Sequence, residues 1–359
     1  MKSANKIIFI INVLEIGGAA KMIKCVADWS VDWFQEVHVV SLFDSKLDGP
    51  LNPNIVYHPM AIDINNSKFW RCQAAVKLRK LVKEISPVIV CSFVSDVCVL
   101  ARLSTLGLNI KFVSSERGNP NNLSMLWKSL VSFAYQTSDA CIFQLEQARD
   151  FFGKRVVGKS FVIPNATEIK SLPSLPKVRN KTIVSAGRFV EEKRYDLLIH
   201  AFYEVTKCHP DYRLIIYGSG PLLPMYQKLV TELGLQKSVS FPGYVSDVFA
   251  AIQNEGIFVL SSSSEGIPNS LIEALAAGIP TVSTDCTPGG PAFLTQNGQN
   301  GLLIPVNDVN AMSSAIIRII ESPDLQEKLS NSGPKILYTL SYDNIYRMWQ
   351  SAFQAILNS

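Results

Sequence analysis

Several features that mark common protein classes are missing from this sequence of 359 residues. No segment approaches the roughly 20 consecutive apolar residues of a membrane-spanning helix. The seven cysteines are scattered and include no C-x2-C pair. Lys and Arg do not form the dense stripe that nucleic-acid binders carry. The sequence therefore argues against a membrane span, a zinc or disulfide framework and a nucleic-acid partner, and it favours a reducing cytoplasm.

Charged residues make up only 18% of the chain, against 47% hydrophobic residues, which is typical of a well-packed globular protein. The length suits two domains of about 150 to 200 residues. Residues 1–170 contain 20 Lys and Arg against 14 Asp and Glu, whereas the remaining residues contain 14 against 16. The excess of positive charge therefore belongs to the first half, where it could attract anionic lipid or a phosphorylated acceptor.

The most informative stretch is SSSSEGIPNSLIEALAAGIPTVST, residues 261–284. Together with the apolar residues before it, this stretch predicts strand, helix and strand over residues 257–260, 269–277 and 281–283. Pro268 has the φ suited to a first helical turn, and Asn269 or Ser270 can cap the helix. Gly278 is typical of a helix end.

Two carboxylates flank the start of this helix. Glu265 is expected in the loop at the carboxyl end of a strand, and Glu273 lies one turn inside the helix. Between them, Gly266 and the backbone amides of residues 269–271 (Asn269, Ser270 and Leu271) form a potential anion site at the helix N-terminus. Carboxylates that accept hydroxyl hydrogen bonds, on either side of an anion site, suit a sugar, a diphosphate and a ribose. The alternative is that Glu265 and Glu273 are solvated surface acids.

The segment EGIPNSLIE is similar to the E-x7-E motif of glycosyltransferase family 4, whose members are retaining enzymes. The resemblance implies an α/β protein of the GT-B fold, with two facing Rossmann-like domains and a cleft between them. It implies transfer of a sugar from a nucleotide sugar, without metal or cofactor. Glu265 would position the donor sugar, Glu273 would hold the ribose, and the amides near Asn269 would hold the diphosphate.

A second group of candidates follows the predicted strand at residues 182–185, in the sequence AGRFVEEKRY. Two cations at the end of a strand, Arg188 and Lys193, would neutralise a diphosphate. This group, with Gly187, resembles the G-R…K phosphate site of the family, except that Arg194 replaces a common glycine. Lys193 could instead be an ordinary surface residue.

The segment GSGPLL contains Gly218 and Gly220, which invites the interpretation of a dinucleotide site. The third glycine and the acidic ribose partner of that motif are missing, so the signal for an NAD-dependent oxidoreductase is weak. In the family a similar turn borders the donor site. The resemblance also places the nucleotide base near Tyr244 and Val245.

In the first half, residues 7–13 predict a buried strand, and Gly17 and Gly18 begin a turn into a helix. Glycine there would let a phosphate approach the backbone, but a tight turn without a ligand is an equal alternative. Farther along, SSERGNP places Glu116 and Arg117 where many family members have a histidine. Glu116 could act as a base and Arg117 could bind phosphate, or the two could form a structural salt bridge.

Residues 68–85 contain six cations, Lys68, Arg71, Lys77, Arg79, Lys80 and Lys83. Their apolar residues recur at helical spacing, which predicts a helix that covers the sheet with a solvated cationic face. The alternative is a surface that rests on an anionic membrane.

These observations predict an acceptor-binding domain over residues 1–170 and a donor-binding domain over residues 171–341, with residues 342–359 crossing back to the first. The resemblance predicts a hexose or N-acetylhexosamine, carried by a nucleotide such as UDP. It would be moved to a polyprenyl-diphosphate-linked saccharide, as in O-antigen or other surface-polysaccharide synthesis. The enzyme would be peripheral at the inner face of the cytoplasmic membrane. A non-catalytic membrane scaffold is a further alternative.

Overall fold

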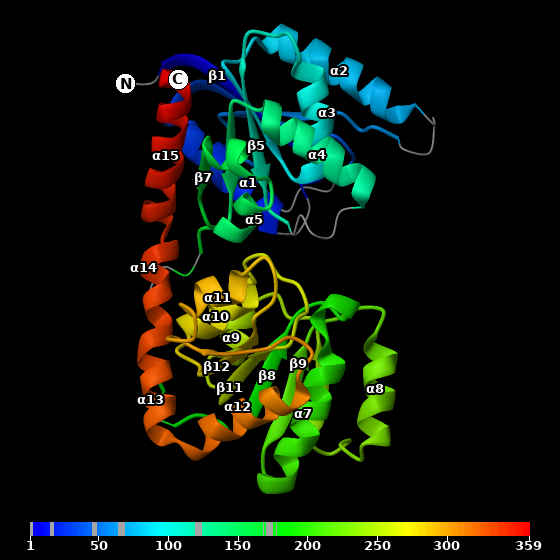
Figure 1. Ribbon diagram of the computed structural model, residues 1–359, viewed down its shortest axis with the longest axis vertical. Coiled ribbons are helices and arrows are strands. Elements are labelled where there is room, and N and C mark those ends of the chain that lie inside the picture. The colour runs from blue at the N-terminus through cyan, green and yellow to red at the C-terminus, as the bar shows by residue number, and fades with distance from the viewer. Residues whose placement is uncertain are drawn as a thin grey trace. The chain divides into compact units, whose positions relative to one another are not determined.

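The computed structural model describes residues 3–14, 18–44, 49–63, 69–118, 124–167, 169, 175–176 and 178–359 (Figure 1). The chain divides into two compact units. Unit 1 comprises Met1–Ala166 with Tyr342–Ser359, and unit 2 comprises Thr167–Ser341. The sequence placed this boundary after residue 170, whereas the division of the structure follows Ala166.

Unit 1 contains a sheet of seven parallel strands in the order β3-β2-β1-β4-β5-β6-β7. The strands are β1 (Ser3–Ile11), β2 (Phe34–Ser41), β3 (Ile55–Pro59), β4 (Ile89–Phe93), β5 (Lys111–Glu116), β6 (Ala140–Phe143) and β7 (Ser160–Val162). In the central register, Ile7 of β1 pairs with Val37 of β2 and with Ile89 of β4. The strand order reverses between β1 and β4, which is the arrangement of a doubly wound domain.

Helices cover both faces of this sheet. They are α1 (Gly18–Ser30), α2 (Trp70–Ile85), α3 (Ser95–Thr105), α4 (Met125–Thr137), α5 (Glu146–Asp150), α6 (Lys154–Val157) and α15 (Tyr342–Asn358). Ile7, Phe9 and Ile11 pack on one face, in the core shared with α1 and α15. Ile8 and Ile10 pack on the other face, with α2 and α3. Because successive side chains of a strand point to opposite faces, a sheet covered on both sides requires the unbroken apolar run seen in β1.

The C-terminal helix α15, red in Figure 1, completes one of these cores. Its buried residues recur at helical spacing and include Ile345, Trp349, Phe353 and Ile356. The ring of Trp349 stacks on Phe93 of β4, with the centroids 5.9 Å apart. The last helix of the chain is therefore part of the hydrophobic core of unit 1.

Unit 2 contains six parallel strands in the order β10-β9-β8-β11-β12-β13. The strands are β8 (Thr182–Ala186), β9 (Arg213–Tyr217), β10 (Val239–Gly243), β11 (Ile257–Leu260), β12 (Thr281–Thr284) and β13 (Leu302–Ile304). The helices are η2 (Glu191–Lys193), α7 (Tyr195–Cys208), α8 (Leu223–Glu232), α9 (Val248–Ile252), α10 (Asn269–Ala276), α11 (Gly290–Leu294), α12 (Val309–Glu321), α13 (Pro323–Ser332), η3 (Gly333–Lys335) and α14 (Ile336–Leu340). The strand order reverses between β8 and β11.

The strand-helix-strand prediction for residues 257–284 is confirmed by β11, α10 and β12. The predicted helix cap is wrong. Pro268 is the N-cap residue of α10, with extended φ and ψ of −75° and 116°, and no side chain caps the helix. Asn269 and Ser270 already lie inside the first turn, so neither occupies the capping position. Among the described helices, none has the length and apolar character needed to cross a bilayer.

Candidate active site

The carboxyl ends of β8 and β11 lie side by side at the point where the strand order of unit 2 reverses. In doubly wound sheets, ligands bind in the crevice at this point. The loop after β8 carries Gly187, Arg188 and Lys193, and the loop after β11 carries Glu265 and Gly266. The topology therefore brings together two groups of predicted site residues that are far apart in the sequence.

Lys193 and Glu265 form an ion pair at this reversal point. Lys193 Nζ donates to Glu265 Oε1, and Ser262 Oγ donates to the same oxygen at 2.7 Å. The side chains of Lys193 and Glu265 are 18% and 13% exposed. Because an ammonium group has three N–H donors and a carboxylate has two oxygens, the pair leaves both groups able to contact a ligand as well.

Hydrogen bonds between loops hold this pair in place. Ser261 Oγ donates to Lys193 O at 2.7 Å, and Ser263 N donates to Glu192 O at 2.8 Å. Glu265 N donates to Thr287 O at 3.1 Å, which ties the β11 loop to the loop after β12. The charged side chains therefore stand on backbone that is fixed from three strand ends.

Cys286 lies close to this pair. Burial, together with the negative charge of Glu265, raises the pKa of the Cys286 thiol to about 12. The thiol is therefore neutral at physiological pH, and its surroundings do not favour a thiolate nucleophile.

Arg188, the second predicted phosphate ligand, is exposed on the loop between Gly187 and Phe189. Like Lys193, Arg188 follows the carboxyl end of β8, but its side chain is exposed to solvent whereas that of Lys193 is half-buried. Its role in binding phosphate stays a prediction.

The glycines near β8 and β9 permit close packing between loops. A side chain at Gly218, where φ is +140°, would place its Cβ 1.8 Å from Gly187 O. A Cβ on Gly220 would lie 2.6 Å from Phe189 O. These glycines are thus required by contact between the β8 and β9 loops, which gives them a reason other than approach to a dinucleotide.

The loop after β10 belongs to the same edge of the sheet. Gly218 N donates to Gly243 O at 2.8 Å, which joins the β9 and β10 loops. Tyr244 follows directly and is 68% exposed, whereas Val245 is half-buried. The predicted base-binding residues therefore lie at the carboxyl end of β10, which is an edge strand of the sheet.

The N-terminus of α10 lies next to Glu265 in the sequence. Leu271 is buried and its N–H donates to Pro268 O at 3.1 Å. The amides of Asn269 and Ser270 lie in the first turn, where a helix offers no acceptor of its own. Glu273 is half-buried one turn farther along an otherwise apolar helix.

In unit 1, Glu116 lies at the carboxyl end of β5 and is 3% exposed. One carboxylate oxygen accepts from the backbone N–H groups of Arg117, at 3.0 Å, and Gly118, at 2.8 Å. The other oxygen accepts from Tyr135 Oη at 3.1 Å and from Ser95 Oγ. Four donors therefore surround this carboxylate, as expected for a buried structural anion.

Arg117 is directed into unit 1 and is 9% exposed. Its guanidinium lies over the rings of Phe93 and Trp349, 5.4 and 5.2 Å from their centroids. It donates to Ile163 O at 3.0 Å and to Asn165 Oδ1 at 3.2 Å. Burial lowers the Arg117 pKa to about 10.

These contacts favour a structural role for Glu116 and Arg117, with hydroxyl, amide and aromatic groups as partners rather than each other's side chains. Their proposed chemical roles stay predictions. Gly18 begins α1, and a Cβ there would lie 3.7 Å from Asn165 Nδ2. Gly17 lies outside the described residues.

Comparison with known proteins yields a matching family model, a relative in sequence and solved structures of similar fold. Residues 168–336 match the family model described as glycosyl transferases group 1. An uncharacterized glycosyltransferase of Haemophilus influenzae is 26% identical over 345 residues, which cover 95% of this chain and 98% of that protein. The lipopolysaccharide outer core galactosyltransferase WaaB, solved in its apo form, has a TM-score of 0.81 at 22% identity and covers 98% of this chain and 99% of its own.

HepE of Anabaena, solved in complex with UDP, has a TM-score of 0.83 at 17% identity, over 98% of this chain and 100% of its own. The fold is GT-B. The match to the glycosyl transferases group 1 model and the Haemophilus influenzae relative support glycosyltransferase activity for this GT-B protein. The family match spans the Lys193–Glu265 pair and the α10 N-terminus.

Sequence reasoning missed several polar residues of this GT-B site. Ser261 and Ser262 are buried, and each positions one member of the ion pair. The signal was present, because a run of four serines follows the apolar strand directly. Thr287, whose carbonyl fixes Glu265, had no comparable signal, because only the strand order places it there.

Proposed function

We propose that this protein is a retaining glycosyltransferase of family 4. It transfers a hexose or N-acetylhexosamine from a nucleotide sugar, of which a UDP-sugar is the favoured donor, to a lipid-linked saccharide. The observation that carries this proposal is the Lys193–Glu265 pair at the strand-order reversal of unit 2. A cation and a carboxylate held together at that point suit a donor that combines a diphosphate with sugar hydroxyl groups.

In the proposed reaction, the acceptor hydroxyl oxygen forms a bond to the anomeric carbon on the face that the diphosphate leaves. The bond from that carbon to the diphosphate oxygen breaks, and its electron pair stays on the diphosphate. The acceptor proton passes to the departing nucleoside diphosphate. Negative charge thus grows on the diphosphate, where Lys193, Arg188 and the first amides of α10 stabilise it.

The two glutamates have different tasks in this scheme. Glu265 accepts hydrogen bonds from the donor sugar and holds Lys193 in position. Glu273 accepts hydrogen bonds from the ribose, and the backbone near Tyr244 and Val245 contacts the base. Neither a metal nor a cofactor is required, because two cations and a helix N-terminus act on the leaving group.

We infer the acceptor and the location from the structural neighbours and from the distribution of charge. WaaB is a lipopolysaccharide outer core galactosyltransferase, and HepE was solved with UDP, which favour a surface-saccharide acceptor and a UDP-sugar donor. The first half of the chain is the positively charged one. We therefore propose a polyprenyl-diphosphate-linked acceptor, met by a peripheral enzyme at the inner face of the cytoplasmic membrane.

The test is incubation of the protein with UDP-, GDP- and ADP-sugars and a lipid-linked saccharide fraction, followed by mass spectrometry. We expect one donor to be consumed, with release of its nucleoside diphosphate and a mass increase of one sugar on the acceptor. NMR of the product should show the anomeric configuration of the donor. Binding of nicotinamide cofactors without consumption of any nucleotide sugar would contradict the proposal.

A further inference from the structure

Helix α4 has a buried apolar face and also a stripe of exposed apolar residues. Its inner residues are Val131, Ala134 and Tyr135, which are buried. On the outer face, Leu126, Leu130 and Phe133 are 71%, 39% and 46% exposed, at a spacing that forms one stripe along the helix. A surface helix normally presents polar residues outward, so this stripe indicates a partner that is itself apolar.

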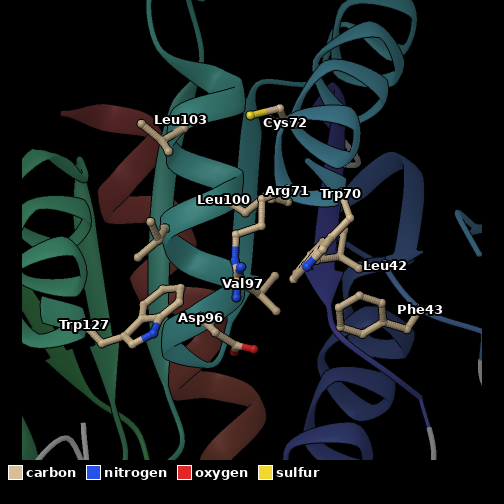
Figure 2. Close-up of a pocket in the computed structure, with 12 residues that line it drawn as sticks. Leu42, Phe43, Trp70, Arg71, Cys72, Asp96, Val97, Leu100, Leu103 and Trp127 are labelled. Atoms are coloured by element: carbon tan, nitrogen blue, oxygen red, sulfur yellow. The ribbon is translucent and has the colours of Figure 1, made fainter. Parts of the chain in front are cut away.

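A pocket of about 300 Å³ lies between α2, α3 and α4, and α4 contributes Trp127 to it (Figure 2). Its walls are mainly apolar and include Phe43, Trp70, Leu100, Leu103 and Trp127. Leu103 is 50% exposed, so the apolar wall continues onto the outer surface of α3. The size lies at the lower end of the range for small-molecule sites.

An arginine is held beside this apolar space. Arg71 lies between two indole rings, with its Cζ atom 4.4 Å from the Trp70 centroid and 5.5 Å from the Trp127 centroid (Figure 2). The residue is exposed, so its charge is available to a ligand in solution. Stacking fixes the plane of a guanidinium while leaving its N–H groups for a phosphate. Asp96 is the one carboxylate that lines the pocket in the described part of the chain.

The three helices around the pocket carry seven Lys and Arg residues against two carboxylates. Arg79 of α2 donates to Ser104 O at 2.9 Å and to Leu106 O at 2.8 Å, so it holds the end of α3. Other cations of α2, including Lys77 and Lys83, lie on its exposed face. The apolar surface is therefore bordered by positive charge.

We propose that the pocket between α2, α3 and α4 binds one hydrocarbon chain of an anionic phospholipid, and that the outward stripe of α4 rests on the same membrane. An occupant must fill an apolar space and place an anion near Arg71. A phospholipid at a membrane surface meets both requirements and also covers the exposed stripe of α4. The proposal rests on the membrane location proposed above but not on glycosyl transfer, because each of its residues belongs to unit 1.

Vesicles of phosphatidylcholine, with and without phosphatidylglycerol, test the surface by sedimentation. We expect binding to vesicles that contain phosphatidylglycerol, with a loss of affinity as salt increases. Phosphatidylglycerol brominated on its chains tests the pocket, because bromine quenches indole fluorescence on contact. The other three tryptophans lie in the core formed with α1 and α15 (Trp29 and Trp349) or pack against it (Trp33), so quenching reports on Trp70 and Trp127.

Two variants separate the parts of the proposal. Changing Leu126, Leu130 and Phe133 to Ser should reduce vesicle affinity by about tenfold or more, because the apolar stripe is lost. The matched control changes the exposed residues Val178, Met225 and Tyr338 of unit 2 to Ser and should bind like the wild type. Ala75→Phe, which fills the pocket from α2, should abolish quenching by brominated lipid.

Three results would overturn the proposal. These are equal binding to neutral and anionic vesicles, binding without quenching of tryptophan, and quenching that Ala75→Phe leaves unchanged. Circular dichroism of each variant establishes that it is folded. Release of nucleoside diphosphate from a nucleotide sugar, measured without vesicles, keeps this test independent of the proposed reaction.

Discussion

The ion pair between Lys193 and Glu265 stabilises both charges and also restricts how each side chain can contact a ligand. Each side chain is less than one-fifth exposed, so removing one leaves the other as a partly buried charge without its partner. A diphosphate that binds Lys193 must therefore share it with Glu265, and a sugar hydroxyl that reaches Glu265 meets a carboxylate already fixed by Ser262. The pair is thus a preformed unit rather than two independent ligands.

We predict that Glu265→Gln and Lys193→Ala each reduce sugar transfer by about 100-fold or more, because loss of one preorganised group that acts on developing charge typically has this effect. The double variant should lose less than the product of the two single effects, since the residues act together. Lys181→Ala, which breaks the exposed Lys181–Asp211 pair, is the matched control and should retain activity. Turnover near that of the wild type in either site variant would sink the assignment.

Glu273→Ala should raise KM for the nucleotide sugar while kcat changes little. Contacts to a ribose are similar in the ground state and the transition state, so their loss weakens binding more than chemistry. Steady-state kinetics with donor varied to saturation measures both constants. A large fall in kcat at saturating donor would contradict the assigned role.

Glu116→Gln tests whether the buried carboxylate of unit 1 is structural. An amide would place an N–H₂ group against donors now bound by the carboxylate, such as the N–H of Gly118 or the hydroxyl of Tyr135. We expect the free energy of unfolding of unit 1 to fall by about 1 to 3 kcal/mol, the usual effect of a buried polar group without a partner. Urea unfolding followed by tryptophan fluorescence measures this change. Unchanged stability with a loss of kcat of about 100-fold or more would instead favour Glu116 as a base.

At the scale of elements, strands β2 and β3 carry a pair of histidines in contact. His38 Nδ1 lies 3.0 Å from His58 Nε2, and Glu36 lies 3.3 Å from the other nitrogen of His38. One ring must donate to the other, so protonation of both would place two donors face to face. Burial lowers the pKa of both side chains below the ordinary value of 6.5. At His38 the hydrogen bond and negative charge of Glu36 oppose part of this shift, and the positive charge of Lys6 adds to it.

At a pH between the lowered pKa values of the folded protein and the ordinary value of 6.5, the histidines of the unfolded chain therefore bind more protons than those of the folded protein. The free energy of unfolding should rise with pH in the window below 6.5 and become flat above it. Urea midpoints at about pH 5 and about pH 8 measure this difference. Changing His38 and His58 to Gln should remove most of it, and an unaltered slope in that variant would place the titrating groups elsewhere.

The elements of unit 2 were largely predictable from the sequence, because their physical causes are local. The run Ile257–Leu260 is buried on both faces and therefore reads as an unbroken apolar strand. The beginning of α10 after Pro268 and its end before Gly278 follow from backbone preferences of those two residues. The prediction of the cap was wrong. Asn269 and Ser270, which are both good capping residues, follow Pro268, but Pro268 itself occupies the capping position.

The contacts between elements could not be predicted in this way. The ion pair between Lys193 and Glu265 depends on β8 and β11 being neighbours, which no local pattern specifies. Arg117 was predicted either to bind phosphate or to form a structural salt bridge. Neither alternative specified the rings above it, which come from β4 and from α15, far along the chain. The pocket between α2, α3 and α4 likewise combines residues of three helices that are separate in the sequence.

At the scale of the whole molecule, unit 2 has a core of its own. Every buried residue of its main hydrophobic cluster lies between Ile183 and Leu329. We therefore predict that residues 167–341, produced alone, unfold cooperatively on heating and bind the nucleoside diphosphate of the donor. Calorimetric melting and titration with UDP measure these properties. A polypeptide that binds hydrophobic dye and shows no cooperative transition would contradict this prediction.

Unit 1 is not formed by one continuous segment, because α15, which follows unit 2 in the chain, supplies part of its core. Phe9 and Phe93 belong to the first strands of the chain, whereas Trp349 and Phe353, which pack against them, are made after the whole of unit 2. During translation, the whole of unit 2 is made while one face of the unit 1 sheet is covered by α1 but not yet by α15. Domains usually fold in the order in which they leave the ribosome, but here the first to be started is the last that can close. Until α15 has been made, the nascent chain therefore exposes part of an apolar sheet face, of the kind that chaperones recognise.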